Sequence, residues 1–233
     1  MYKDVSPNRW STKAIETVTR AGLMTGYPNG TFKPGQAITR EEVAAVFARY
    51  LFRDGVFTDI LPAVMPAVVM VHRGDALGSG ACVARRNGKS YILTNAHVVG
   101  DKTTFGLVKE EMPNFYGTLI TKDQSLDLAL IATDTLLPAL EVNTNIVLGQ
   151  PVAVIGAPFG YIESVTVGVI SSLHRDKWFQ MDAPVSPGSS GSPVVNEYGE
   201  IVGLTVAKVV DVAVEGMGFA IKPEVIKDFI RRV

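Results

Sequence analysis

The sequence predicts a mainly β fold, a Greek-key sandwich or a pair of barrels, with a small helical module in front and one helix at the C-terminus. Three observations carry this prediction. Beyond residue 60, short apolar and β-branched segments are regularly interrupted by Gly, Pro and Asn; helical periodicity is confined to the two ends; and the charge balance changes near residue 55. Twelve strands are expected, at residues 67–72, 80–84, 91–94, 104–107, 117–121, 128–133, 151–156, 165–173, 179–181, 192–196, 201–209 and 218–221.

The first 51 residues are expected to form two helices around a glycine-rich loop. The earlier helix begins after Pro7 or Trp10 and ends at Gly22, because glycine commonly follows the last turn of a helix. The segment 26–30, Gly-Tyr-Pro-Asn-Gly, is expected to be a loop, since proline and two glycines disfavour both helix and strand. The apolar face of the earlier helix comprises Ala14, Ile15, Val18 and Ala21.

The second helix has a clear N-terminal signal. Thr39 stands three residues before Glu42, the spacing of a capping box, in which each side chain bonds the backbone N–H of the other residue. The helix then places on one face Val43, Val46, Phe47, Tyr50 and Leu51. A last helix is expected from Pro223, and it packs on the second barrel through Val225, Ile226, Phe229 and Ile230.

The composition limits the classes of function. Of the 233 residues, 22 are Lys or Arg and 23 are Asp or Glu, a net charge of −1, whereas nucleic-acid-binding proteins are usually strongly basic. The single cysteine, Cys82, excludes an internal disulfide and a multi-cysteine zinc site, and neither a metal nor a cofactor is expected. The longest apolar run, residues 60–71, is too short to span a bilayer. The N-terminus lacks the pattern of a signal peptide, so any such peptide has been removed or never existed.

The charge changes sign along the chain. Residues 1–55 carry 8 Lys+Arg against 5 Asp+Glu, a balance of +3, and residues 56–233 carry 14 against 18, a balance of −4. The apolar pattern changes from helical to β at the same place. We therefore expect a domain boundary between Phe52 and Asp59, with a helical module at 1–55 and a β domain at 56–233.

The N-terminal segment resembles an S-layer homology (SLH) module over residues 2–51, with Glu41 where the family usually has Ala. The motifs that match in order and spacing are Tyr2-Lys3-Asp4-Val5, Trp10, Ala14-Ile15, Gly22, Gly26-Tyr27-Pro28-Asn29-Gly30-Thr31-Phe32-Lys33-Pro34 and Ile38-Thr39-Arg40-Glu41-Glu42.

This resemblance implies non-covalent binding to the secondary cell-wall polysaccharide of bacteria and a location at the cell surface or outside the cell. The arginine of the family's motif, here Arg40, contacts anionic sugar groups, and Trp10 and Asn29 are further candidates. The alternative is that Arg40 is a solvated residue of the first helical turn and Trp10 belongs to the core. Such proteins usually carry three repeats that assemble together, so the single repeat implies a homotrimer. An intracellular or phage origin stays open.

The first candidate for chemistry in the β domain is His97, which follows an apolar segment ending in Thr94-Asn95-Ala96. A strand end of this kind can fix the orientation of the ring. A buried core histidine is the alternative. His72 lies within an apolar strand and His174 in a charged turn, so His97 is the best placed of the three histidines.

The second and third candidates are an aspartate and a serine. Asp127 opens the apolar run Leu-Ala-Leu-Ile; it is either a turn residue or a buried carboxylate that needs a partner such as an imidazole N–H. Ser190 lies in the sequence Ser186-Pro-Gly-Ser-Ser-Gly-Ser-Pro193, where consecutive N–H groups can stabilise an oxyanion. A flexible Gly/Ser linker is disfavoured there, because apolar segments flank the run.

Together these features resemble the chymotrypsin-like serine proteases, with His, Asp and Ser in that order at separations of 30 and 63 residues, and more specifically the bacterial HtrA/Deg branch. The resemblance covers about residues 62–230. It rests on Pro66-Ala67-Val68-Val69, Gly78-Ser79-Gly80 and Gly216-Met217-Gly218-Phe219-Ala220-Ile221, and on the runs at 91–99, 127–131, 154–158 and 180–193.

The resemblance implies a chymotrypsin-like double Greek-key β-barrel that hydrolyses peptide bonds in protein or peptide substrates without a cofactor. Ser190 would be the nucleophile, His97 the general base and then acid, and Asp127 the carboxylate that orients the imidazole. The oxyanion hole falls on the turn of Gly188, Ser189 and Ser190, with the N–H groups of Gly188 and Ser190 as donors.

Two departures from the family concern neighbours of the nucleophile. Ser189 stands where digestive enzymes have an aspartate that pairs with a newly cleaved N-terminus, so that activation route is not expected. Ser192 replaces a usual glycine, and we expect this to be tolerated. The branch usually carries a PDZ domain after the protease, whereas this chain ends at Val233, so regulation through such a domain is not expected.

The pocket for the residue before the cleaved bond is expected to be uncharged. Pro184 aligns with its base, Val206, Ala207 and Lys208 with the edge that pairs with substrate, and Gly218 with a wall. The resemblance therefore implies preference for a small or medium aliphatic residue. Two other interpretations remain: an inactive protease-fold scaffold or chaperone-like binder, and a mainly wall-binding protein that carries the protease domain as cargo.

Overall fold

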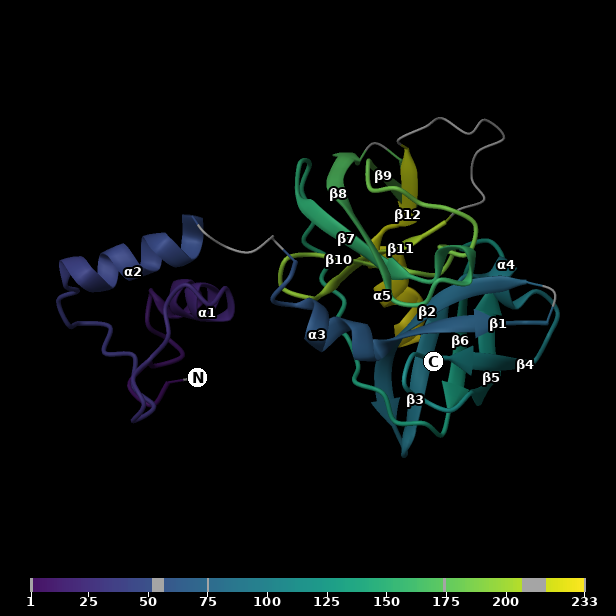
Figure 1. Ribbon diagram of the computed structural model, residues 1–233, viewed down its shortest axis with the longest axis horizontal. Helices are drawn as coiled ribbons and strands as arrows, with labels where there is room; N and C mark the ends of the chain where they lie inside the picture. Colours follow the sequence, from purple (N-terminus) through teal and green to yellow (C-terminus); the bar gives the residue numbers. More distant parts are fainter. Residues whose placement is uncertain (1, 52–56, 75, 174, 207–216, 233) are drawn as a thin grey trace. The chain divides into compact units, whose positions relative to one another are not determined.

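The computed structural model describes residues 2–51, 57–74, 76–173, 175–206 and 217–232 (Figure 1). The chain divides into two compact units, Met1–Val56 and Phe57–Val233. The boundary expected between Phe52 and Asp59 falls largely on residues 52–56, which lie outside the described residues.

The first unit contains α1 (Thr12–Arg20) and α2 (Arg40–Leu51). Helix α1 ends as the sequence predicts. Gly22 has φ +66°, its N–H bonds the carbonyl of Thr19, and the N–H of Leu23 bonds the carbonyl of Val18 at 2.9 Å. These bonds satisfy carbonyls that the helix end would otherwise leave unpaired.

The capping box of α2 is confirmed. The N–H of Thr39 donates to Oε2 of Glu42 at 2.8 Å, and the N–H of Glu42 donates to Oγ1 of Thr39 at 3.1 Å. The bond from the Thr39 amide stabilises the ionised carboxylate and lowers the pKa of Glu42 below its usual value.

The loop between these helices is held by the first residues of the chain. The N–H groups of Phe32 and Lys33 donate to the carboxylate of Asp4 at 2.8 and 2.7 Å, which lowers the pKa of Asp4. The hydroxyl of Tyr2 accepts the N–H of Gly26 at 2.8 Å, and a Cβ at Gly26 would lie 2.1 Å from the Tyr2 ring. The motif residues therefore fix the loop, and glycine at 26 lets the ring approach.

Fewer side chains of the first unit are buried than the periodicity of its helices predicts. Of its described side chains, those of Val5, Thr12 and Ile15 are buried, while Ala14, expected on the apolar face, is exposed. Phe47, which lies on the apolar face predicted for α2, has a side chain that is 59% exposed. Two helices and a loop offer no further layer to cover these faces. Tyr50 and Leu51 were expected on the same face, but their side chains lie outside the described ones.

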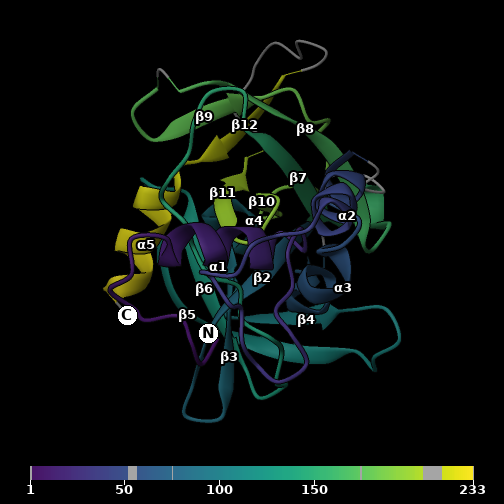
Figure 2. The same ribbon diagram turned by 90° about the vertical axis from the view of Figure 1, so that its left-hand side faces the viewer.

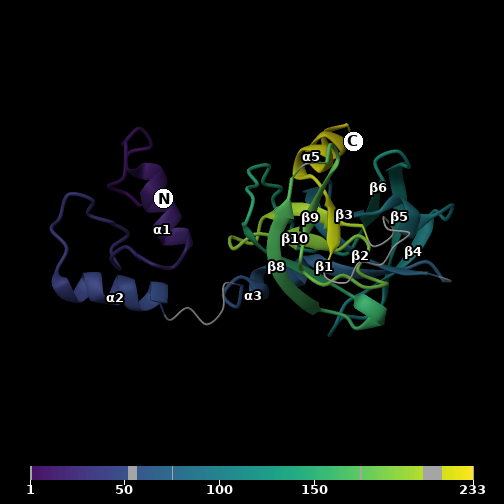
Figure 3. The same cartoon turned by 90° about the horizontal axis from the view of Figure 1, so that it is seen from above.

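The second unit contains twelve strands in its described residues, as predicted. They form two closed barrels, in the orders β1-β2-β3-β6-β5-β4 and β10-β11-β12-β9-β8-β7, which lie side by side (Figure 3). The chymotrypsin-like double barrel is thus confirmed. The bounds are β1 (Val68–His72), β2 (Leu77–Arg86), β3 (Lys89–Thr94), β4 (Thr104–Val108), β5 (Phe115–Asp123), β6 (Leu128–Thr133), β7 (Pro151–Gly156), β8 (Ser164–Ser172), β9 (Trp178–Met181), β10 (Pro193–Val195), β11 (Ile201–Thr205) and β12 (Gly218–Ile221).

Short helical turns join these strands. Helix α3 (Leu61–Val64) and the 3₁₀ turn η1 (Met65–Ala67) precede β1 and were not predicted; Pro62 and Pro66 occupy their first-turn positions, where proline has no N–H bond to lose. Two others are α4 (Ala96–Val99) and η2 (Pro158–Gly160).

The C-terminal helix α5 (Pro223–Arg231) packs against β11 and β6 (Figure 2). Its predicted docking face is confirmed at Ile226 and Phe229, which are buried. In the part of the chain that the structure describes, no helix has both the length and the apolar character needed to cross a membrane.

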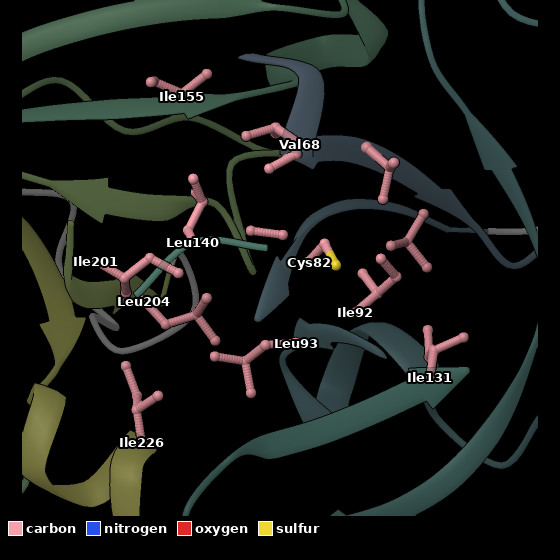
Figure 4. Close-up of a cluster of buried hydrophobic side chains, with 14 of the residues drawn as sticks. Val68, Cys82, Ile92, Leu93, Ile131, Leu140, Ile155, Ile201, Leu204 and Ile226 are labelled. Atoms are coloured by element: carbon pink, nitrogen blue, oxygen red, sulfur yellow. The ribbon is translucent and has the colours of Figure 1, made fainter. Parts of the chain in front are cut away.

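One apolar cluster joins the two barrels (Figure 4). It brings Leu93 of the first barrel together with Ile155 and Leu204 of the second and with Ile226 of α5. The free thiol of Cys82 lies in the same cluster, fully buried, and burial raises its pKa. Packing of apolar side chains therefore sets the relative position of the two barrels.

Candidate active site

His97 and Asp127 meet because their strands are neighbours. Strand β3 pairs with β6, with Thr94 opposite Ala129, so the residues that follow β3 lie beside those that precede β6. Nδ1 of His97 is 2.7 Å from Oδ2 of Asp127, and the His97 N–H donates to Oδ1 at 2.9 Å. The carboxylate thus fixes both the ring and the backbone of His97.

The backbone around Asp127 is specialised for this contact. Asp127 has φ +55°, a conformation that aspartate tolerates better than most residues. Its carbonyl accepts a hydrogen bond from Nδ2 of Asn95 at 3.0 Å. The two interpretations of Asp127 therefore both hold: its backbone forms a turn, and its carboxylate is paired with the histidine.

Ser190 lies in a tight turn between β9 and β10. Gly188 and Gly191 have φ of +94° and +82°, and the N–H of Ser192 donates to the carbonyl of Ser189 at 3.0 Å. The hydroxyl of Thr205, at the end of β11, donates to the same carbonyl. Ser189, Ser190 and Ser192 are buried, as a folded turn requires, so the linker alternative is excluded.

Ser79 of β2 joins this turn to the first barrel. Its N–H donates to the carbonyl of Ser190 at 2.8 Å, and its hydroxyl donates to the carbonyl of Gly188 at 2.9 Å while accepting the N–H of Ala157 at 2.9 Å. Its carbonyl accepts the hydroxyl of Thr94 at 2.7 Å. Ser79, which is fully buried, thus binds the Ser190 and Gly188 carbonyls, the Ala157 N–H and the Thr94 hydroxyl.

Two glycines let the segments approach. A Cβ at Gly78 would lie 2.6 Å from Cγ1 of Val98 and 3.1 Å from the carbonyl oxygen of Ser190. A Cβ at Gly191 would lie 2.1 Å from the Ser79 carbonyl and 2.5 Å from Oγ1 of Thr94. The main chain of Ser190 and the side chain of Val98, the residue after His97, therefore both lie close to Gly78.

The direction of one amide in this turn, that of Gly188, is fixed by its neighbours. The carbonyl of Pro187 accepts the N–H of Phe159 at 2.8 Å, and all described peptide bonds are trans, so the Gly188 N–H points the opposite way. Among the described residues, the Gly188 amide has no acceptor. The N–H of Ser189, the residue between the two expected donors, donates to the carbonyl of Ser186 at 2.8 Å, so it is already used within the turn.

The predicted pocket residues are partly described. Gly218 faces Met181 and Ala183, which the sequence comparison did not single out, and a Cβ at Gly218 would lie 3.0 Å from the Ala183 carbonyl. Val206 is buried and its N–H donates to the carbonyl of Phe219 at 2.9 Å. Pro184 is exposed, and its carbonyl accepts the Thr166 hydroxyl at 2.8 Å. Ala207 and Lys208 lie outside the described residues, as does His174.

The predicted glycan residues of the first unit are all exposed. The side chain of Trp10 is 91% exposed, so its assignment to the core is wrong. Arg40 begins α2, and Oδ1 of Asn29 accepts the backbone N–H and hydroxyl of Thr31. Among the described residues, no hydrogen bond or ring contact joins the three predicted residues, and no cluster of His, Cys, Asp and Glu side chains could hold a metal.

Comparison with known families decides the classification. The trypsin-like peptidase domain matches residues 78–204, more than half of the chain, and the S-layer homology domain matches residues 2–44. The chain belongs to the trypsin-like peptidase family. It carries an SLH domain at its N-terminus, and both resemblances read from the sequence are confirmed.

Relatives of this trypsin-like peptidase include bacterial serine proteases. A serine protease HtrA-like protein of Staphylococcus aureus strain MRSA252 is 34% identical over 181 residues, 68% of this chain and 24% of the relative. Its counterpart in strain USA300 is 34% identical over 179 residues. The chain thus spans about a quarter of the length of these relatives. The crystal structure of the serine endoprotease from Yersinia pestis matches with a TM-score of 0.66 and 32% identity, over 74% of this chain and 64% of that one.

Two buried serines of this trypsin-like peptidase allow a matched prediction. Ser79→Ala removes a hydroxyl that bonds two backbone groups, so we expect a loss of about 1–3 kcal/mol of unfolding free energy together with slower turnover. Ser192→Ala removes a hydroxyl that has no partner among the described residues, so stability should be unchanged or higher by about 1 kcal/mol. Urea unfolding of both variants measures this. Equal destabilisation by the two substitutions would contradict the assigned role of Ser79.

Proposed function

We propose that the chain is a serine endopeptidase in which Ser190, His97 and Asp127 act as a catalytic triad. The observation that carries the proposal is the double contact of the Asp127 carboxylate with Nδ1 and the backbone N–H of His97. The family membership and the attachment of the Ser190 backbone to β2 support it. A scaffold without catalysis would have no need for this paired and oriented imidazole.

The reaction follows from the groups present. Ser190 Oγ attacks the scissile carbonyl carbon while Nε2 of His97 takes the hydroxyl proton, and Asp127 stabilises the imidazolium without itself being protonated. The carbonyl oxygen becomes an oxyanion that the N–H groups of Gly188 and Ser190 stabilise. The C–N bond then breaks, the imidazolium proton passes to the leaving amine, and water releases the acyl group by the same steps in reverse.

The primary pocket favours aliphatic residues in this proposal. Gly218 and its neighbours Met181 and Ala183 are small or apolar, and Pro184 carries no charge. The carboxylate of Asp182 accepts the N–H of Val169 at 2.6 Å, which turns it toward β8. These groups offer no anionic partner for an arginine or lysine side chain.

We also propose that the SLH domain binds secondary cell-wall polysaccharide and thereby holds the peptidase at the bacterial surface. The exposure of Arg40 and Trp10 supports it, since a cation and an aromatic ring in solvent suit an anionic glycan. The few buried side chains of the first unit favour assembly with further copies, for which a homotrimer is the arrangement implied by the family resemblance.

The catalytic proposal is tested with a fluorophosphonate probe and a peptide substrate. The wild type should label, and Ser190→Ala should abolish labelling and lower kcat by roughly 10⁶-fold. Asp127→Asn retains the shape but favours the wrong tautomer of His97, and it should lower kcat by roughly 10⁴-fold. An unlabelled wild type would favour the inactive scaffold or chaperone-like binder.

Pocket preference is tested with substrates that differ only in the residue before the cleaved bond. Valine, alanine and leucine substrates should have higher kcat/KM than arginine and lysine substrates, by about tenfold or more, because a cation would enter an uncharged pocket without a partner. Strict cleavage after Arg or Lys would overturn this assignment.

Wall binding is tested by co-sedimentation with purified cell-wall polysaccharide. Arg40→Ala should weaken binding by about tenfold, whereas Lys13→Ala, which removes an exposed cation on α1, should have little effect. Equal loss in both variants would indicate nonspecific charge attraction. Retention of full binding by Arg40→Ala would refute the role of Arg40.

A further inference from the structure

Lys109 and Glu163 form a shielded ion pair that links the two barrels. Lys109 directly follows β4 and Glu163 directly precedes β8. The Lys109 Nζ is 2.5 Å from Oε1 of Glu163 and donates a second hydrogen bond to the carbonyl of Met65 at 2.9 Å. The two side chains are 10% and 21% exposed, so removal of one partner would leave the other charge poorly solvated.

Glu163 ends the connection between β7 and β8, residues 157–163. It has φ +61°, an unfavourable backbone conformation for a glutamate that the surrounding contacts must maintain. Its ion pair provides such a contact, because Lys109 is itself held by the carbonyl of Met65 in η1. The end of the connection is thus fixed to the first barrel.

The beginning of the same connection forms the wall behind the Gly188 amide. The N–H of Phe159 holds the carbonyl of Pro187, and the N–H of Ala157 holds the hydroxyl of Ser79. A Cβ at Gly188 would lie 2.5 Å from the Ala157 carbonyl and 2.9 Å from the Phe159 nitrogen. A displacement of this connection would therefore rotate the Pro187–Gly188 peptide.

We propose that Lys109 and Glu163 are positioning residues for the oxyanion hole. Their ion pair fixes the 157–163 connection, and Phe159 then keeps the Pro187 carbonyl turned away, so that the Gly188 N–H faces the scissile carbonyl. Neither side chain touches the reacting atoms. The inference rests on the proposed endopeptidase function and adds to it a pair of residues that act through the backbone.

The test compares Lys109→Met, Glu163→Gln and the double variant with Lys89→Met. Lys89 forms the matched control pair with Asp134, which is 2.9 Å away and exposed. The single variants should lower kcat about tenfold with KM unchanged, less than the roughly 10²–10³-fold loss on removing an oxyanion donor. The double variant should be no slower than the worse single variant, and Lys89→Met should equal the wild type.

A second readout addresses the oxyanion hole itself. A peptidyl boronate adds to Ser190 and places an anionic oxygen in the hole, so its affinity should fall about tenfold in both single variants. The affinity of the cleavage-product peptide should stay constant. Melting temperatures recorded in parallel identify any variant that is merely unfolded, and if Lys109→Met does not fold, Glu163→Gln decides.

Each outcome bears on a different claim. Unchanged kcat and boronate affinity in folded variants would overturn the positioning role, as would a change confined to KM or an activity loss that only follows the melting temperature. An inactive wild type that binds no boronate would instead refute the endopeptidase function. The two failures are therefore distinguishable.

Discussion

Ser79 lies on β2 at the junction of the barrels, and its N–H, carbonyl and hydroxyl all bond to segments that carry the site. Ser79 therefore binds both the backbone of Ser190 and Thr94, the last residue of the strand β3 that leads to His97. A movement of β2 would carry both segments together, so their separation is protected from small shifts of either barrel. The catalytic geometry is thus built from backbone bonds to one buried strand.

This arrangement depends on the apolar cluster beneath it (Figure 4). Burial of each large side chain there, such as Leu93, Leu204 or Ile226, contributes about 1.5–3 kcal/mol, whereas a typical internal hydrogen bond contributes about 1 kcal/mol net. Packing therefore supplies most of the free energy that holds the barrels together. The hydrogen bonds of Ser79 are directional, so they select one relative orientation of the two barrels among those that apolar packing allows.

Much of this fold was accessible from the sequence because strand alternation and turn residues are local signals. The triad candidates were accessible as well, since His97 and Ser190 lie in motifs whose residues are contiguous. The role of Ser79 could not be predicted from the sequence, because it depends on which segments the closed barrels bring together. The only local signal at this position is a serine between two glycines in an apolar strand. Ala14 was misplaced because periodicity identifies a face without showing what covers it. The sequence also cannot tell which amides a turn already uses, as the bond from the Ser189 N–H to the Ser186 carbonyl shows.

The buried thiol of Cys82 has a practical consequence. Because burial raises its pKa and shields it from solvent, this sole cysteine stays protonated and out of reach of alkylating reagents while the protein is folded. The folded chain therefore behaves toward thiol chemistry as though it had no cysteine. A cysteine introduced at an exposed position of either unit would be the single reactive thiol, so a fluorophore or spin label could be attached there without altering the native sequence elsewhere.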